Sequence, residues 1–174
     1  MSLTNGDNFA NVTTLPSGST YTFCSLFKQS GVISAEHLIL PATTLTNYCY
    51  RALFSKAVSL QKAPELPATT LAQGVYWYMF ENCAIEEAPV LVATTLPKEA
   101  YGYMFTGCSN LRYIKCLATT KTATDCLKGW VTSVAATGIF VHEDDVSWTT
   151  GVNGIPTGWT SINKSEEGHG DDPD

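Results

Sequence analysis

Apolar side chains return along this chain in units of about 25 residues. The letters "ATT" begin at residues 42, 68, 93 and 118, and the aromatic residues Phe54, Phe80, Phe105 and Trp130 keep the same spacing. Two markers in phase indicate a structural repeat whose units share one continuous core. The sequence therefore predicts a solenoid of stacked units.

Within each unit, one stretch has the apolar pattern of a helix. After Leu45, apolar residues fall four and eight positions later, at Cys49 and Leu53, and a second row follows at Tyr50 and Phe54. A single apolar stripe of this kind is typical of an amphipathic helix. The threonine pair before each stretch is suited to cap the helix N-terminus. We therefore expect a short helix in each unit.

An extended segment is expected after each helix. Its inward positions are Leu60, Ala63 and Leu66, which recur as Ile85, Ala88 and Leu91 and as Leu111, Ile114 and Leu117. Prolines in two of the three segments limit the backbone hydrogen bonds between neighbouring units. The predicted fold class is an α/β repeat, a leucine-rich-repeat-like solenoid in which each unit has a short extended segment, a Pro/Thr corner and a short helix.

The repeats divide the chain into four parts. Residues 1–39 are expected to form an N-terminal cap with a degenerate first repeat, and residues 40–117 contain three good repeats. Residues 118–162 are expected to form a further degenerate repeat and a C-terminal cap. Residues 163–174, "NKSEEGHGDDPD", are expected to be an acidic flexible tail in which His169 is solvated.

Composition narrows the class of partner. Of the 174 residues 44% are hydrophobic and 15% are charged, with a net charge of −6. Basic residues are too scattered for a nucleic-acid footprint. No apolar stretch is long enough to span a membrane, and the start "MSLTNGDNF" lacks the features of a signal peptide. We therefore expect neither a nucleic-acid partner nor a membrane span.

The six cysteines are expected to be buried thiols. Cys49 is replaced by Val75 and Ala100 in the next units, and Cys83 and Cys108 share their position with Ala57. A position that accepts cysteine, valine and alanine favours a small apolar group. A disulfide between Cys83 and Cys108 is the alternative. The sequence has no Cys-x-x-Cys pair, so we expect no zinc site.

No pattern of catalytic residues is evident. His37 lies in the apolar run "AEHLIL" and is expected to be partly buried, and the cluster Glu143, Asp144 and Asp145 is expected to be an acidic surface turn, with cation binding as the alternative. No "GxSxG" motif or nucleophile paired with a base is present. We therefore expect no enzyme activity, no cofactor and no metal.

The candidate binding residues are large side chains outside the core positions. They are Tyr48, Arg51, Trp77, Tyr78 and Tyr103. Amphipathic rings on a rigid surface are typical of contact sites. These positions vary between units while the core positions stay constant, which suits a binding scaffold but also neutral drift. In the alternative interpretation, Tyr78 and Tyr103 pack along the stack as a further inner row.

The repeat resembles that of a known family. The unit "LPATTLxxxCYxxMFxxCxxLxxAP", present in variants at 40–64, 66–89 and 91–114, is similar to the BspA-type leucine-rich repeat of surface and prophage-borne proteins of gut Bacteroidales. The ending "VSWTTGVNGIPTGWT" resembles the closing cap of such proteins. The resemblance covers residues 8–162 and departs from the family pattern at Ala57, Val75 and Ala100.

The resemblance implies a curved leucine-rich-repeat solenoid at the cell surface, in the extracellular space or on a virion. It implies recognition or adhesion to a protein or glycan, and it brings no catalytic residues. The alternative is a structural or tail-associated component of a prophage particle or surface assembly. The sequence leaves the ligand, the binding face and the oligomeric state open.

Overall fold

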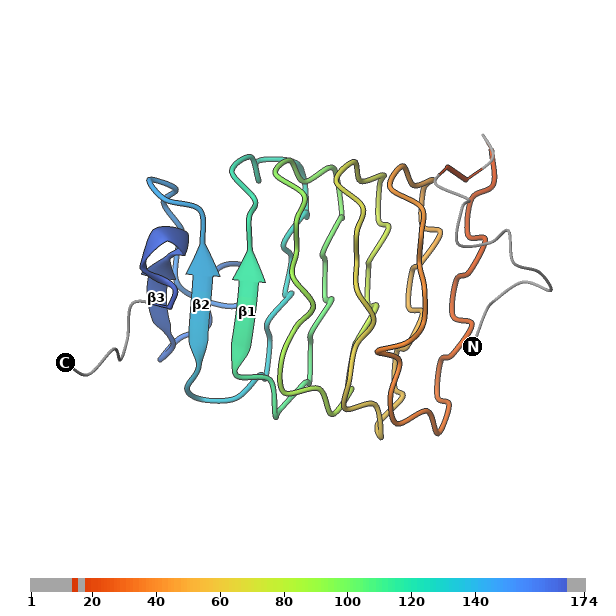
Figure 1. Cartoon of the computed structure of the whole chain (residues 1–174), viewed down its shortest axis with the longest axis horizontal. Helices are drawn as coiled ribbons and strands as arrows, with labels where there is room; N and C mark the ends of the chain where they lie inside the picture. Colours follow the sequence, from red (N-terminus) through yellow and green to blue (C-terminus); the bar gives the residue numbers. More distant parts are fainter. Residues whose placement is uncertain (1–13, 16–17, 169–174) are drawn as a thin grey trace.

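A computed structural model describes residues 14–15 and 18–168 and shows coils stacked side by side along the longest axis of the molecule (Figure 1). We number the coils 1 (18–39), 2 (40–65), 3 (66–90), 4 (91–116) and 5 (117–142). The regular elements are the strands β1 (Tyr113–Cys116), β2 (Ile139–His142) and β3 (Thr160–Asn163) and the 3-10 helix η2 (Lys164–Glu166). The strands form one parallel sheet in the order β1-β2-β3.

The prediction of a helix in each unit is wrong. The part of the chain that the structure describes has a short 3-10 helix near the C-terminus but no α-helix, so the fold is not an α/β solenoid. The segments that were expected to be helical, such as residues 45–57, are runs of consecutive turns. Their backbone hydrogen bonds give the reason.

In these runs, every second backbone N–H points to the next coil. The N–H groups of Ala52 and Phe54 donate to carbonyl oxygens of coil 3 at 2.8 and 2.9 Å. The N–H of Leu53, between them, donates to Tyr50, three residues back, at 3.2 Å. An α-helix requires each N–H to reach the carbonyl four residues back. The alternation therefore excludes a helix and joins neighbouring coils instead.

A positive φ at every fourth residue produces this alternation. In coil 2 the residues are Tyr48, Ala52 and Lys56, with φ angles of 57°, 53° and 62°. The left-handed region costs a non-glycine residue roughly 1–2 kcal/mol. The hydrogen bonds along the stack and the burial of the residues between the turns offset that cost. The buried pairs return every four residues because each turn takes four.

Lys56 offers a test of this backbone. Lys56→Gly is expected to raise the free energy of unfolding by about 0.5–1 kcal/mol, because glycine adopts positive φ without strain although it loses more chain entropy. In a helix the same change would cost about 1 kcal/mol. Urea denaturation measures the difference. Lys62→Gly, at an exposed residue without positive φ, should be destabilising and serves as the control.

The "LPATTL" corner between the extended segment and the turn run contributes buried side chains to the core, as its leucines were expected to do. Leu66 and Ala68 of one corner are 4% and 2% exposed. The corner threonines do not cap helices. Thr44 pairs with Thr70 of the next coil in a parallel bridge, as Thr95 does with Thr120. The corners therefore contribute backbone pairing between coils and leucine side chains to the core.

Aromatic ladders run through the core from coil to coil. Phe54 stacks on Phe80 with ring centroids 5.6 Å apart, and Phe80 stacks on Phe105 at 5.8 Å, with interplanar angles of 3° and 4°. Trp130 was expected to continue this series. The N–H of Phe105 donates to Trp130 O, whereas that of Phe80 donates to Met104 O, so Trp130 occupies the position of Met104. Coil 5 therefore has one extra residue before its turn run.

Tryptophans close the C-terminal end of the stack. The indole N–H of Trp130 donates to Gly154 O at 2.9 Å, and that of Trp159 donates to Ala135 O at 2.7 Å. Trp148 stacks against Trp130 with centroids 6.1 Å apart. Residues 148–159 thus pack against the last coil.

The expected tail is ordered in its first residues. Glu167 accepts hydrogen bonds from Tyr113 Oη and Lys115 Nζ of β1, which fixes the segment that follows β3. The residues from 169 onward, including His169, lie outside the described part of the chain, as do residues 1–13 of the expected N-terminal cap.

The cysteines are buried thiols, as predicted, with one exception. All six are free, and Cys24 alone is half-buried rather than buried. Cys83 Sγ donates to Phe54 O at 3.2 Å, and Cys108 Sγ donates to Phe80 O at 2.9 Å. Each thiol thus bonds to the preceding coil, and the alternative of a disulfide between Cys83 and Cys108 is not found.

The other polar residues singled out in the sequence lie on the surface. His37 was expected to be partly buried, but its side chain is 89% exposed. In this run Ala35, Leu38 and Leu40 are buried, whereas Glu36, His37 and Ile39 are exposed, so His37 lies on the outward side of the segment. Asp144 and Asp145 form the expected acidic surface turn, in which Asp144 Oδ1 accepts from the N–H of Ser165 at 3.1 Å. In the described residues, no helix has the length and apolarity to cross a membrane.

Candidate functional site

The five residues proposed from the sequence lie on the turn runs of coils 2, 3 and 4. We call this set, Tyr48, Arg51, Trp77, Tyr78 and Tyr103, the aromatic face. All five side chains are half-buried. The backbone fixes their positions, because the N–H of Arg51 donates to Tyr48 O at 3.1 Å and that of Tyr78 donates to Gly102 O at 3.0 Å. Backbone hydrogen bonds within a coil and between coils therefore hold the residues of the face in place.

Three rings meet at the centre of the face. Tyr78 and Tyr103 stack with centroids 4.8 Å apart and an interplanar angle of 7°. Trp77 stands nearly perpendicular to both, at 80° to Tyr78 and 74° to Tyr103, with centroid distances of 5.7 and 5.3 Å. The two tyrosines do stack as a row, as the alternative interpretation proposed. The row is not an inner one, because its rings keep part of their surface exposed.

Trp77 and Tyr48 are each matched by a glycine one unit later. A Cβ added at Gly102 would lie 2.3 Å from Cζ3 of Trp77, and one at Gly74 would lie 2.1 Å from Cε1 of Tyr48. Trp77 and Gly102 occupy equivalent positions in successive coils. The glycine leaves room for the ring of the preceding coil to lie over its backbone. The difference between Trp77 and Gly102, and that between Tyr48 and Gly74, therefore pairs a large side chain with a glycine in the next coil, which neutral drift alone does not explain.

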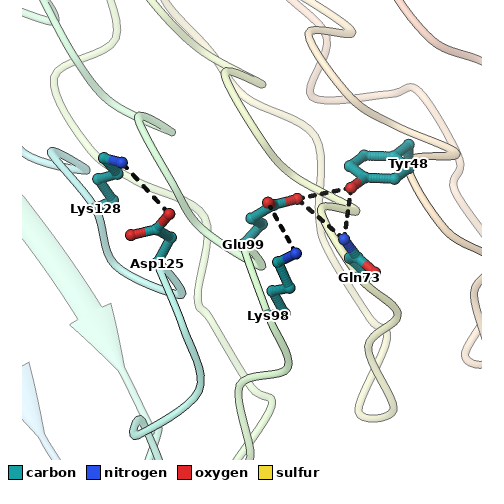
Figure 2. Close-up of polar contacts among 6 residues, drawn as sticks. All are labelled: Tyr48, Gln73, Lys98, Glu99, Asp125 and Lys128. Atoms are coloured by element: carbon teal, nitrogen blue, oxygen red, sulfur yellow. Dashed lines mark hydrogen bonds and ion pairs between the residues drawn. The ribbon is translucent and has the colours of Figure 1, made fainter.

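A polar network borders the face (Figure 2). Tyr48 Oη donates to Glu99 Oε2 at 2.7 Å, and Gln73 Nε2 donates to Tyr48 Oη at 2.6 Å and to Glu99 Oε2 at 3.2 Å. Lys98 Nζ lies 3.7 Å from the other carboxylate oxygen of Glu99. The three bonded residues come from three successive coils and point toward one another. The network therefore ties the border of the face across the stack.

The charges of the network are held in fixed states. The hydrogen bond from Tyr48 lowers the pKa of Glu99, and the same bond raises the pKa of Tyr48. Glu99 is therefore ionised and Tyr48 is neutral and donating at neutral pH. The pair presents one acceptor group and one orienting hydroxyl at the Tyr48 part of the face.

Charged groups of both signs lie near the three rings. Burial raises the pKa of Tyr78, followed by the nearby Tyr103 and Glu81, and the charge of Arg51 acts against this rise. Lys128 pairs with Asp125 at 3.3 Å, an ion pair seen in Figure 2, and this pair raises the pKa of Lys128. The face thus combines apolar ring surface with hydrogen-bonding groups of opposite charge.

Sequence reasoning missed part of the site. It did not find Gln73, Glu99 or Tyr21, whose ring stacks on Tyr48 with centroids 5.0 Å apart. The usable signal was the glycine that follows Tyr48, Trp77 and Tyr103 by one unit. A helical interpretation of the turn runs hid it, because a helix places different residues side by side.

Within residues 14–15 and 18–168, no group of three or more His, Cys, Asp or Glu side chains could hold a metal ion. Comparisons with protein-family models, curated proteins and solved structures found no match to this chain.

Proposed function

We propose that this protein is a non-enzymatic recognition module that binds a protein or a glycan through the aromatic face. The main support for this proposal is the cluster of Trp77, Tyr78 and Tyr103, whose half-exposed rings contact one another at centroid distances of 4.8 to 5.7 Å. Partly exposed, rigid aromatic groups bring large contact area at low entropic cost. The proposal rests on this geometry.

The border of the face supports the same function. Glu99, Tyr48 and Gln73 supply hydrogen-bonding groups at the Tyr48 part of the face, and Arg51 supplies a cation. Binding sites for neutral or mixed-charge ligands combine apolar contact with a few oriented polar groups. The ring that lies over a glycine is held in place before a ligand arrives, which reduces the entropy lost on binding.

The family resemblance supplies the setting of the proposal. Proteins with BspA-type repeats occur at cell surfaces or on virions, and we propose such a location for this chain. An adhesion role agrees with a surface in which charged residues are few and threonines line the corners.

Loss of the central rings tests the proposal. The double change Trp77→Ala and Tyr78→Ala is expected to weaken ligand capture at least 30-fold, since hot-spot aromatic residues contribute about 2 kcal/mol or more. A glycan microarray and a panel of purified host matrix proteins provide the readout. Val90→Ala, at an exposed apolar residue in the extended segment, is the matched control and should bind like the original protein.

A second variant tests whether binding depends on the position of the Trp77 ring and not only on its presence. Gly102→Ala keeps every aromatic residue but places a Cβ where Trp77 lies, so the indole must move. Capture is expected to fall while the far-ultraviolet circular dichroism stays the same. Full capture by both the double variant and Gly102→Ala would exclude the aromatic face as the binding site.

A further inference from the structure

Coils 3 and 4 make the same pair of contacts with the coil before them. Phe80 stacks its ring on Phe54, and Cys83, three residues later, donates its thiol hydrogen to Phe54 O at 3.2 Å. Phe105 and Cys108 repeat both contacts with Phe80, the second at 2.9 Å. Each of these two coils thus receives an aromatic ring and a backbone carbonyl oxygen from its predecessor.

In coil 1, Phe27 and Ser30 occupy the positions that in coils 3 and 4 contact the ring and the carbonyl oxygen of the preceding coil. The N–H of Phe27 donates to Leu53 O at 2.8 Å, as Phe54 does to Met79 O, so Phe27 begins the ladder. The N–H of Ser30 donates to Phe27 O at 3.2 Å, as that of Cys83 does to Phe80 O at 3.0 Å. Ser30 therefore takes the place of the bonded cysteines.

Both receiving groups lack their partner within the described residues. The ring of Phe27 stacks on Phe54 at 5.4 Å, and no other described ring contacts it. The hydroxyl oxygen of Ser30 is buried and has no hydrogen-bond partner there. A buried hydroxyl without a partner costs free energy, so this position favours a ligand that supplies an acceptor.

A pocket lies at these two residues. Its volume is about 430 Å³. Its apolar walls are Phe27, Val32, Ala35, Leu38 and Phe54, and its polar lining residues are Ser30, Ser34, Glu36 and His37, of which Ser30 has the buried hydroxyl. Val32 lies where later coils have the larger Leu60, Ile85 and Leu111, so the interior of coil 1 holds a smaller side chain at this position. Pockets of this size that are mostly apolar and have a few polar groups are typical of ligand sites.

We propose that this pocket docks a peptide segment that inserts an aromatic side chain against Phe27 and whose backbone carbonyl accepts the hydrogen bond from Ser30. The segment would repeat the contact that coils 3 and 4 make with the coils before them. The site is separate from the aromatic face and goes beyond the function proposed for that face. The chemistry favours a peptide over a hydrocarbon because Ser30 needs an acceptor as well as an apolar neighbour.

Small analogues of the segment test the proposal on the full chain. N-acetyl-phenylalanine methylamide carries the ring and the carbonyl, N-acetylglycine methylamide carries the carbonyl alone, and toluene carries the ring alone. In ¹H–¹⁵N and methyl NMR titrations, the phenylalanine analogue is expected to shift the signals of Val32, Ala35 and Leu38 in a saturable way. The glycine analogue should cause no saturable shift at the same concentrations.

Two variants identify the contribution of each contact. Ser30→Ala should fold, because Ala57 occupies the equivalent position, and it should weaken the phenylalanine analogue about fivefold while toluene binds as before. Val32→Phe should fill the pocket and abolish both, whereas Val58→Phe, at a residue 67% exposed, should change neither. The proposal fails if the phenylalanine analogue causes no saturable shift, or if Ser30→Ala leaves its affinity equal to that of the original protein.

Discussion

Replacing Phe80 with alanine is expected to lower the free energy of unfolding by about 3–5 kcal/mol, as for other buried aromatic truncations. Phe80 is fully buried and has a stacked ring on each side, Phe54 at 5.6 Å and Phe105 at 5.8 Å. Alanine would leave a cavity in the middle of the ladder. The neighbouring coils cannot close it, because their backbones are held at fixed spacing by inter-coil hydrogen bonds.

Urea denaturation followed by circular dichroism measures this loss. Phe80→Leu should cost less than Phe80→Ala, because it keeps most of the apolar volume. Tyr21→Ala is the control, since Tyr21 is 47% exposed and its removal should cost well under the loss at Phe80. A loss below about 1 kcal/mol for Phe80→Ala would contradict the packing described for the ladder.

Alkaline pH is expected to unfold this protein. Burial raises the pKa of Cys49 to about 11 and those of Cys83 and Cys116 to about 12, from an ordinary value of 9.0, and it raises the pKa of Cys108 further. In the unfolded chain these thiols lose their protons near pH 9, whereas in the folded chain they keep them. The unfolded state therefore binds fewer protons above pH 9, and the free energy of unfolding falls as pH rises.

The size of the effect follows from the number of thiols. Each group contributes about 1.4 kcal/mol for each pH unit above its unfolded pKa, so the four together cost about 5 kcal/mol at pH 10. Total stabilities of domains are about 5–15 kcal/mol. The contribution is fully present below about pH 8 and is lost between about pH 9 and 12. Burial also raises the pKa values of Tyr76 and Tyr101, which steepens the fall above pH 10.

Urea denaturation at pH 7.5, 9 and 10 in the presence of a reductant measures this dependence. The double change Cys83→Ala and Cys108→Ala removes two of the four thiols and should reduce the slope by about half. Ala57, in the equivalent position of coil 2, shows that alanine fits there. A free energy of unfolding that stays constant between pH 8 and 10 would show that the thiols are not buried.

The burial pattern was predictable from the sequence, but the backbone that produces it was not. Cys49, Tyr50, Leu53 and Phe54 are all buried, as the apolar stripe predicted. Their period is four residues, and a helix with 3.6 residues per turn drifts by about 40° at each such step. Over the short length of one unit this drift is too small to distinguish a helix from a series of turns.

For the aromatic face, too, the sequence predicted the residues but not all of their contacts. The sequence identified Trp77, Tyr78 and Tyr103, and the structure brings them into contact. The hydrogen bonds of Glu99 with Tyr48 and Gln73 join residues up to 51 positions apart. Such contacts depend on which side chains the stacking brings together, so they could be found only once the positions equivalent between coils were known.

The sequence by itself determined the length of the repeat, the buried positions, the structural corner and the residues of the aromatic face. These follow from local apolar patterning and from its recurrence, which are visible in one chain. The tertiary structure alone decided the backbone conformation of the turn runs. Their N–H groups bond to the next coil rather than within the segment, so the left-handed residues that replace the helix are stable only in the stack.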